Sequence, residues 1–453
     1  MRAAGLVGAN ALMLLVGLGL LPWLGVARSW RELVARSGLA YLCGLVATGI
    51  LAATLALVHV GFGWLALALV AAISALSAAW HLRGTQRPRL SWPRWTSLAA
   101  VAALVALLVE YARAFAVAPL NRYDAWAIWA LKGHALYAFG WADPVVFAGD
   151  AYRFANLDYP LWLPSLEAID FRAMGAFDTR LVHLQFLLFL VAALAALAAL
   201  LRDVVPALAL WPTLGAIALS PAVFDQLLTA YADVPLALVF AVGVAAAGRW
   251  LLTGERWALA VATLCFAGAL LTKNEGTLFV AAAYAGLLAA APRRWRALAV
   301  AAAADVALLL PWRIYTRVHE LHDVSYTLRD TFHARHPGVG PIAVRHLAAQ
   351  MLDPLQWGLL APIFVALLIV AAALGARRLA LYGGVFTLLS WLGLSWIYVI
   401  SHFEYSSYLH STETRVVASI VLAGAALIPL LAGEAWASAR VRGRPRGAGA
   451  RIP

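Results

Sequence analysis

The chain has little of the charge that a soluble protein needs at its surface. Only 12% of its 453 residues are Asp, Glu, Lys or Arg, whereas 64% are hydrophobic. Soluble globular domains carry about twice that share of charged residues. A soluble fold is therefore excluded, and the composition predicts an all-α polytopic membrane protein.

Cysteine and lysine are also scarce. The two cysteines, Cys43 and Cys265, both fall inside apolar runs, so neither a disulfide framework nor a thiolate metal site is expected. Lys132 and Lys273 are the two lysines, and arginine supplies all the other positive charge of the Lys and Arg set. The sequence shows no internal repeat, and its compositional bias is confined to the Ala/Leu runs and an Arg/Gly tail.

Apolar runs dominate the rest of the sequence. About thirteen of them are long enough to cross the roughly 30 Å hydrocarbon core as helices. Residues 1–26 are interpreted as the first such helix and not as a signal peptide, because only Arg2 precedes the apolar run and no clear small-x-small cleavage site follows. The runs begin near Gly5, Leu39, Phe62, Leu98, Leu181, Pro206, Val234, Trp257, Thr277, Leu298, Leu359, Leu379 and Val416.

Arginine predicts the orientation of these helices. If thirteen helices alternate, the arginine clusters all fall on one side, which the positive-inside rule makes cytoplasmic. The N-terminus is then outside and the C-terminus inside. The net charge of +12 is explained by this topology and by attraction to anionic membrane lipids, so no nucleic-acid partner is expected. The clusters are Arg28, Arg31 and Arg36; Arg83, Arg87, Arg89 and Arg94; Arg293, Arg294 and Arg296; Arg377 and Arg378; and Arg440, Arg442, Arg444, Arg446 and Arg451.

Acidic residues have the complementary distribution. Only Glu32, Asp203 and Glu255 lie clearly in predicted cytoplasmic loops, with Glu434 at the last inner boundary. The two long non-membrane segments are predicted outside, so the working surface is expected there. The predicted organisation is three N-terminal helices in residues 1–97, a core in residues 98–433 with outer loops 119–180 and 313–357, and a basic tail in residues 434–453.

The first outer loop opens with the stretch NRYDAWAIWALKGHAL. Trp126 and Trp129 recur at helical spacing, which predicts an amphipathic helix with tryptophan at headgroup depth. Asp124 would stand at its N-terminus, where the helix dipole and free N–H groups favour an ionised carboxylate. Two simpler interpretations remain open: Asp124 only caps this helix, and Lys132 only extends toward lipid phosphates.

Four further motifs place polar residues on the same predicted face. Any one of them is weak evidence, because helix ends are usually polar. Together they bring cations that can hold an anionic head group near carboxylates that can take a proton, a layout suited to chemistry on a lipid-linked anion. The motifs are NLDYPLWLPSLEAID with Asp158 and Tyr159, interpreted as an extended strip; YADVPLAL with Asp233; LLTKNEGTLF with Lys273 and Glu275, interpreted as a hairpin; and SHFEYSSYLHSTETR with His402, Glu404 and Arg415.

These stretches also carry a resemblance. YDAWAIWALKGHALY, LDYPLWLP, YADVPLA, LTKNEG and LHSTETR, in this order, resemble the successive motifs of a bacterial branch of the GT-C membrane glycosyltransferases. That superfamily includes protein O-mannosyltransferases and lipid A aminoarabinose transferases. The resemblance runs from about Val101 to Gly433 and leaves the first three helices and the tail outside it.

The resemblance implies an activity and a set of roles. It implies a sugar donor on polyprenyl phosphate, a glycan, lipid or protein acceptor hydroxyl, inversion at the anomeric carbon, and a site facing outward from the bacterial inner membrane. Asp124 matches the essential aspartate and is the expected general base. Ala125 follows it, so a metal bridged by two adjacent acids is not supported, and no cofactor is expected. The expected donor-phosphate ligands are Lys132, Lys273, Arg313 and Arg415, and the expected sugar or acceptor contacts are Asp158, Tyr159, Asp233, Glu275, His402 and Glu404.

Other interpretations compete with a transferase. A transporter or flippase of a lipid-linked sugar would keep polar residues near the bilayer midplane, whereas this chain gathers its charges at one surface. A noncatalytic scaffold would not need converging cations and carboxylates. The stretches HELHD and HARH space histidines like a metal face, but neither is HExxH and a solvated loop is favoured. A charge at Asp305, inside the tenth run, is expensive in a membrane, so Asp305 is either functional or paired, or it is protonated, or it marks a misplaced helix boundary.

Overall fold

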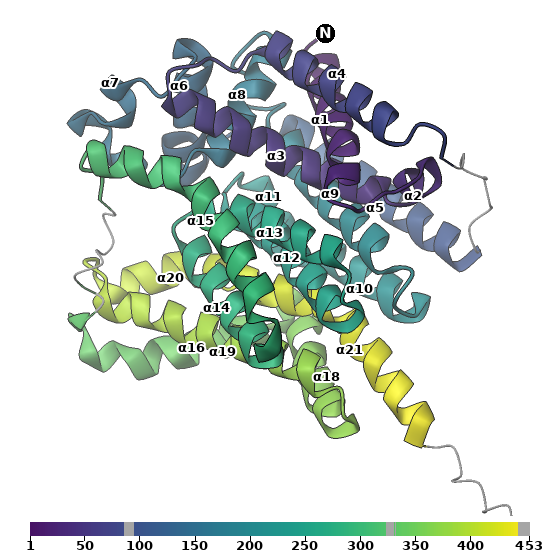
Figure 1. Ribbon diagram of the computed structural model, residues 1–453. Helices are drawn as coiled ribbons and strands as arrows, with labels where there is room; N and C mark the ends of the chain where they lie inside the picture. The colour runs from purple at the N-terminus through teal and green to yellow at the C-terminus, as the bar shows by residue number, and fades with distance from the viewer. Residues whose placement is uncertain (86–94, 323–329, 331, 443–453) are drawn as a thin grey trace, which may run out of the picture.

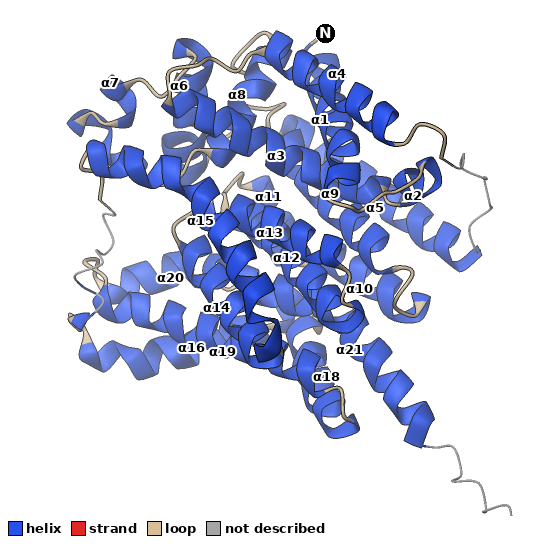
Figure 2. Ribbon diagram, in the orientation of Figure 1, coloured by secondary structure: helices blue, strands red, loops and turns tan. Residues whose placement is uncertain are grey.

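The computed structural model describes residues 1–85, 95–322, 330 and 332–442, and every regular element in these residues is a helix (Figures 1 and 2). The prediction of an all-α membrane protein is confirmed at this level. Within the described residues, nine stretches are long and apolar enough to cross a membrane. They are α1 (Arg2–Trp23), α3 (Ser37–Leu57), α4 (Trp64–His81), Ser97–Val117 of α5 (Trp95–Val117), α9 (His183–Leu201), α12 (Asp233–Thr253), Pro292–Val318 with α15 (Trp295–Val318), α19 (Arg377–Ile400), and Ser407–Arg440 with α21 (Ala418–Arg442).

The remaining apolar runs form shorter or bent helices. One pair is bent by 48° where Ser220 separates its two halves, and it counts as a tenth span if the pair is one span. Three further apolar helices have 15 or 16 residues, short for a straight crossing. Each predicted run is thus helical, while the count of about thirteen spans stays a prediction. The bent pair is α10 (Ala207–Leu219) and α11 (Pro221–Leu228), and the short helices are α13 (Arg256–Leu270), α14 (Glu275–Ala290) and α18 (Leu360–Leu374).

Short helices fill the connections between these elements. Most of them lie in the two stretches that the sequence predicts as long outer loops, so the described parts of those loops contain regular structure. They are α2 (Trp30–Ala35), η1 (Asp124–Ala130), α6 (Leu131–Phe139), α7 (Pro144–Phe147), η2 (Asp150–Ala155), α8 (Trp162–Met174), η3 (Pro292–Arg294), η5 (Pro337–Val339), α16 (Gly340–Leu352), α17 (Pro354–Trp357) and α20 (Tyr405–Val416).

Helix α12 lies at the centre of the bundle. Within its most apolar stretch 89% of the residues are buried, and it packs against α9, α13 and α21. By contrast, only 17% and 6% are buried in α4 and in the Ser97–Val117 stretch, whose apolar side chains face outward as lipid-contacting helices do. The fold therefore has a dry interior around α12 and an apolar exterior.

Small residues bring the N-terminal helices onto the core. A Cβ added to Gly17 would lie 1.7 Å from the carbonyl oxygen of Ala40, so α1 and α3 approach backbone to backbone. Close approach at glycine is a common way for membrane helices to associate. Helix α3 also packs against α8, α9 and α13, so residues 1–85 join the same core. At the other terminus α21 continues to Arg442, and residues 443–453 of the predicted tail lie outside the described residues.

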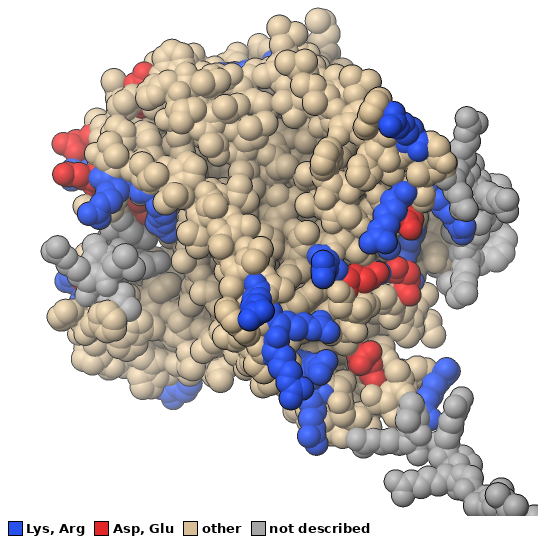
Figure 3. Space-filling model, in the orientation of Figure 1, with Lys and Arg blue, Asp and Glu red and all other residues tan. Residues whose placement is uncertain are grey.

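Charged side chains gather toward two opposite ends of the bundle, with an uncharged belt between them (Figure 3). Helices α6, α7, α16 and α20 lie at one end, and α2 and the C-terminal part of α21 lie toward the other (Figure 1). This arrangement agrees with a membrane-spanning bundle that has two polar faces.

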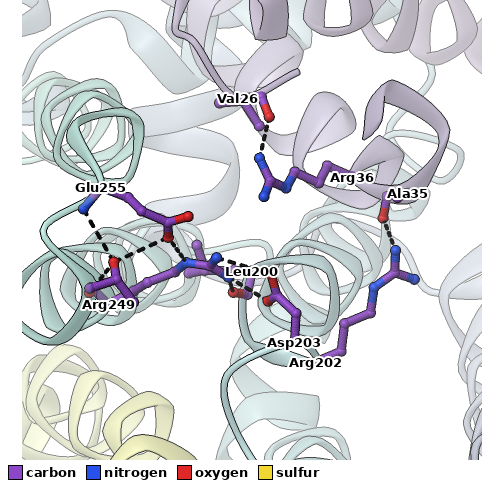
Figure 4. A network of polar contacts seen from close by, with 9 residues as sticks. Val26, Ala35, Arg36, Leu200, Arg202, Asp203, Arg249 and Glu255 are labelled. Carbon is purple, nitrogen blue, oxygen red and sulfur yellow. Dashed lines mark hydrogen bonds and ion pairs between the residues drawn. The ribbon is translucent and has the colours of Figure 1, made fainter. Parts of the chain in front are cut away.

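One polar network occupies the end near α2. Arg249, only 2% exposed, pairs with Asp203 at 2.5 and 3.0 Å and with Glu255 at 2.7 Å, and it donates to the Leu200 carbonyl at 2.5 Å (Figure 4). Nε, Nη1 and Nη2 all have oxygen partners. The network ties α12 to the connection between α9 and α10 and to the connection between α12 and α13.

Candidate functional site

The stretch that opens the first outer loop forms a helix, as predicted. Residues Asp124–Ala130 form a π-helix that passes directly into α6, and short π-helical turns are frequent at functional sites. Trp126 is 51% exposed, but Trp129 is 2% exposed and stacks on the Tyr159 ring at 5.6 Å. The expectation that both tryptophans lie at headgroup depth is therefore wrong for Trp129, because it faces the interior.

Asp124 forms an ion pair with Arg415. The Nη1 atom of Arg415 donates to the Asp124 carboxylate at 2.6 Å, although 291 positions separate the two residues. Their side chains are 26% and 18% exposed, so the pair is largely shielded from solvent. The Arg415 guanidinium also lies 4.6 Å from the centre of the Tyr231 ring. Helix α20 thus carries its last basic residue onto the first residue of η1.

Lys273 is the centre of a second, more buried group. It lies in the connection between α13 and α14, and its Nζ is 2.8 Å from Asp233 and 3.3 Å from Glu275. Burial alone would lower the pKa of Lys273, but the two carboxylates outweigh burial and the opposing charge of Arg415, so the pKa is raised. Lys273 therefore stays charged, and Arg415 lies within its electrostatic reach.

Lys132 is fully buried, and it donates to the carbonyl oxygens of Asn156 at 2.5 Å and Tyr159 at 3.4 Å. Burial lowers its pKa to about 7, with the nearby Asp158 carboxylate acting in the opposite direction. The Tyr159 ring lies between the two lysines, 5.8 Å from Lys132 Nζ and 5.5 Å from Lys273 Nζ. The phosphate-binding role of Lys132 stays a prediction, but its position favours holding the turn after η2.

The strip that carries Asp158 differs from its expected structure. It is irregular only as far as Leu161, and α8 begins at Trp162, so the expectation of an extended strip to Asp170 is wrong. Pro164 fits because it lies in the first helical turn, where a backbone N–H would have no intrahelical partner. Asn274 donates to Asp158 at 2.5 Å, which joins the strip to the Lys273 connection.

The other predicted site residues lie in separate surroundings. Arg313, on α15, donates to Thr277 at 3.4 Å, and His402 is 3.0 Å from Asp330. Glu404 accepts from the Ser407 backbone at 2.9 Å, a cap of the first turn of α20. The structure therefore brings Asp124, Arg415, Asp233, Lys273 and Glu275 close to one another, whereas Arg313 and His402 contact residues outside this group.

Two atoms of this cluster are unused. Among the described residues, Arg415 Nε and Glu275 Oε2 are buried and have no hydrogen-bond partner. Native proteins leave few such atoms, and an unpaired one at a cleft is often completed by a ligand. A phosphate oxygen suits Nε, and a hydroxyl suits Oε2. We name Asp124, Asp233, Lys273, Glu275 and Arg415 the outer cluster, after the face of the membrane on which the sequence predicts them.

A cleft of about 530 Å³ opens between η2 and the C-terminal end of α15. Helix η2, which lines this cleft, also packs against η1, the segment that begins with Asp124, although no residue of η1 lines the cleft itself. Pockets of this size hold small organic ligands. The described part of the chain contains no group of three or more His, Cys, Asp or Glu placed to hold a metal ion, and Asp323 of HELHD lies outside the described residues. The cleft is lined by Ala148, Asp150, Arg153, Leu157, His319, Glu320, Leu321 and His322.

Sequence reasoning missed three groups of polar residues. Arg249 lies near the inner end of a predicted span, where arginine is common, so its position alone does not distinguish it. Gln350 is an isolated amide on an amphipathic helix. Glu167 and Asp170 are 1% and 0% exposed, and burial raises the pKa of both. Their spacing of three on a helix was the one signal that they share a face.

Comparison of the chain with protein-family models, curated proteins and solved structures finds no match. The function is therefore argued from the geometry of the outer cluster.

Proposed function

We propose that the chain is an integral-membrane glycosyltransferase of GT-C type. It moves a sugar from a polyprenyl-phosphate donor to an acceptor hydroxyl at the outer face of a bacterial inner membrane. The supporting observation is the 2.6 Å contact between Asp124 and Arg415, beside the buried Lys273 group. Motifs that the resemblance links in order along the sequence supply both partners of this contact.

Asp124 acts as the general base. It accepts the proton of the acceptor hydroxyl while that oxygen attacks the anomeric carbon and the bond from this carbon to the phosphate oxygen breaks. The bonding electron pair leaves with the polyprenyl phosphate, and attack from the opposite face inverts the anomeric carbon. The cleft beside η2 gives an acceptor an approach to this end of the protein.

Arg415 and Lys273 hold the phosphate. Its negative charge grows as the glycosyl bond breaks, so nearby fixed cations favour the transition state. In the structure the Arg415 guanidinium neutralises the Asp124 carboxylate. A donor phosphate competes for the guanidinium, first through the unused Nε, and so releases the Asp124 carboxylate to accept a proton. Asp233 and Glu275 keep Lys273 in place.

The orientation is part of the proposal and has its own test. Native Cys43 and Cys265 are both buried, so the background for thiol labelling is low. A cysteine at the exposed Val145 near α7 should react with a membrane-impermeant thiol reagent in intact cells, and one at the exposed Arg378 should not. The opposite pattern would place the outer cluster on the cytoplasmic side.

The activity is tested with purified protein in lipid vesicles. A panel of radiolabelled polyprenyl-phosphate hexoses and pentoses serves as donor, and a crude bacterial envelope fraction serves as acceptor. Donor retention and sugar transfer are measured separately. Retention and transfer support the proposal. Movement of intact donor across the vesicle membrane without transfer would instead indicate a flippase, and an absence of retention with every donor would contradict both.

A further inference from the structure

The three residues before Arg415 are each held by a side chain from another helix. The Tyr398 hydroxyl on α19 lies 2.7 Å from Thr412 Oγ1. Glu413 and Thr414 both contact one residue of α16, Gln350. Helix α20 is only twelve residues long, and these contacts hold its last turn together with the apolar packing of Leu409 and Val416.

Gln350 uses both ends of its amide on this turn. Its Nε2 donates to Glu413 at 3.1 Å, and its Oε1 accepts from the Thr414 hydroxyl at 3.0 Å. Successive helical residues point about 100° apart around the axis, so holding two of them fixes the rotation of the helix. The direction of Arg415, the next residue, is fixed with it.

We infer that Gln350 is a positioning residue for Arg415, which directs the Arg415 guanidinium toward the donor phosphate. The inference rests on the proposed function, because it assigns Gln350 an effect on donor affinity that passes through the Arg415 guanidinium. Gln350 itself touches neither Asp124 nor Lys273 through these two bonds. Its amide is well suited to the task because it carries a donor and an acceptor on two separate atoms.

The first experiment removes both bonds. Gln350→Leu keeps a similar volume but cannot donate or accept, and donor retention in vesicles should weaken about tenfold, the effect of losing one or two hydrogen bonds. Arg345→Ala, an exposed change on the same helix, is the matched control and should leave retention unchanged. Retention equal to wild type in Gln350→Leu would overturn the inference.

A double variant separates positioning from helix packing. If Gln350 acts through Arg415, Gln350→Leu should add nothing to the loss of donor retention in Arg415→Ala. A general packing defect would instead weaken retention in both backgrounds by the same factor. A further tenfold loss in Arg415→Ala/Gln350→Leu would therefore contradict the positioning role.

A reciprocal exchange covers the case in which Gln350→Leu does not fold. In Gln350→Glu/Glu413→Gln the new amide donates to the new carboxylate, which still accepts from Thr414. Retention should return to within about twofold of wild type, whereas Gln350→Glu alone places two carboxylates in contact and should weaken it. Failure of the exchange to rescue contradicts the inference. If wild-type protein retains no donor at all, the proposed function fails instead.

Discussion

Two networks that join cations to carboxylates lie at opposite ends of the bundle. They differ in how many of their polar atoms have a hydrogen-bond partner. In the network around Arg249, Nε, Nη1 and Nη2 all have an oxygen partner (Figure 4). Its two carboxylates, Asp203 and Glu255, lie in the connection between α9 and α10 and in the connection between α12 and α13. In the outer cluster, Arg415 Nε and Glu275 Oε2 have no hydrogen-bond partner among the described residues. Its members also come from segments up to 291 positions apart.

This difference separates an ion network that stabilises the fold from one that can bind a ligand. A cation whose nitrogens all have partners within the protein has little left for a ligand, and its removal leaves those partners without their hydrogen bonds. A cation with an unused N–H donor can still form a hydrogen bond to a ligand. The comparison predicts that stability depends on Arg249 and that donor binding depends on Arg415.

The largest effect is expected from Arg249→Ala. Loss of the guanidinium removes four hydrogen bonds and leaves Asp203 and Glu255, which are 47% and 33% exposed, without their partner, so the free energy of unfolding should fall by about 3 kcal/mol. Unfolding of purified protein in detergent measures this change, with the exposed Arg256→Ala as control, which should stay within about 0.5 kcal/mol of wild type. Donor affinity of the folded fraction should be unchanged. A stable Arg249→Ala protein that no longer retains donor would reverse the comparison.

Asp124→Asn comes next and bears on turnover. The amide keeps the shape of the carboxylate but cannot accept the acceptor proton, so sugar transfer should fall by about 100-fold or more. Donor retention, measured on the same sample, should persist because Arg415 is left free for the phosphate. Near-normal transfer by a folded Asp124→Asn protein would leave Asp124 with a structural role only.

Arg415→Ala should weaken donor retention by about 10- to 100-fold, the effect of losing a hydrogen bond to a charged group. Transfer should fall at least as far, because the same charge favours the transition state. Lys273→Ala should affect both donor binding and stability, because it removes a phosphate ligand and leaves the buried Asp233 carboxylate without its partner. Its free energy of unfolding must therefore be measured beside its donor affinity. Unaltered retention in Arg415→Ala would remove the distinction between the two networks.

The smallest effect concerns Lys132, which by its contacts belongs with the structural cations. Its pKa is lowered to about 7 in the folded protein from an ordinary value of 10.5. Between these values the unfolded chain binds more protons than the folded one, so stability should rise with pH from about pH 7 to pH 10. In Lys132→Met this rise should be flatter, as measured by unfolding midpoints at successive pH values. An identical slope in both proteins would show that Lys132 does not titrate in this range.

The helical fold could be predicted because apolar periodicity and length are local properties of the sequence. Trp129 and Lys132 show where local reasoning fails. Both were expected at the membrane surface, yet Trp129 packs on Tyr159 and Lys132 donates to two interior carbonyls. A sequence gives the side of a helix that a residue occupies, but not which neighbouring segment covers that side.

The outer cluster was predicted in part. The predicted topology places Asp124 and Arg415 at the same face of the membrane, because Asp124 follows the fourth predicted span and Arg415 precedes the last one. Their direct contact depends on the way α20 docks on its neighbours, which is set by side chains such as Gln350 and Tyr398. Those contacts join distant segments and leave no periodic signal.

The ion pair between Asp124 and Arg415 also has a consequence for biosynthesis. With 291 positions between its partners, synthesis at about 5–20 residues per second separates their emergence by roughly 15 to 60 s. During that interval Asp124 has been synthesised and its cation has not, so the proposed catalytic set is incomplete. Under the proposed function, a chain that stops before Arg415 is therefore inert toward lipid-linked sugars.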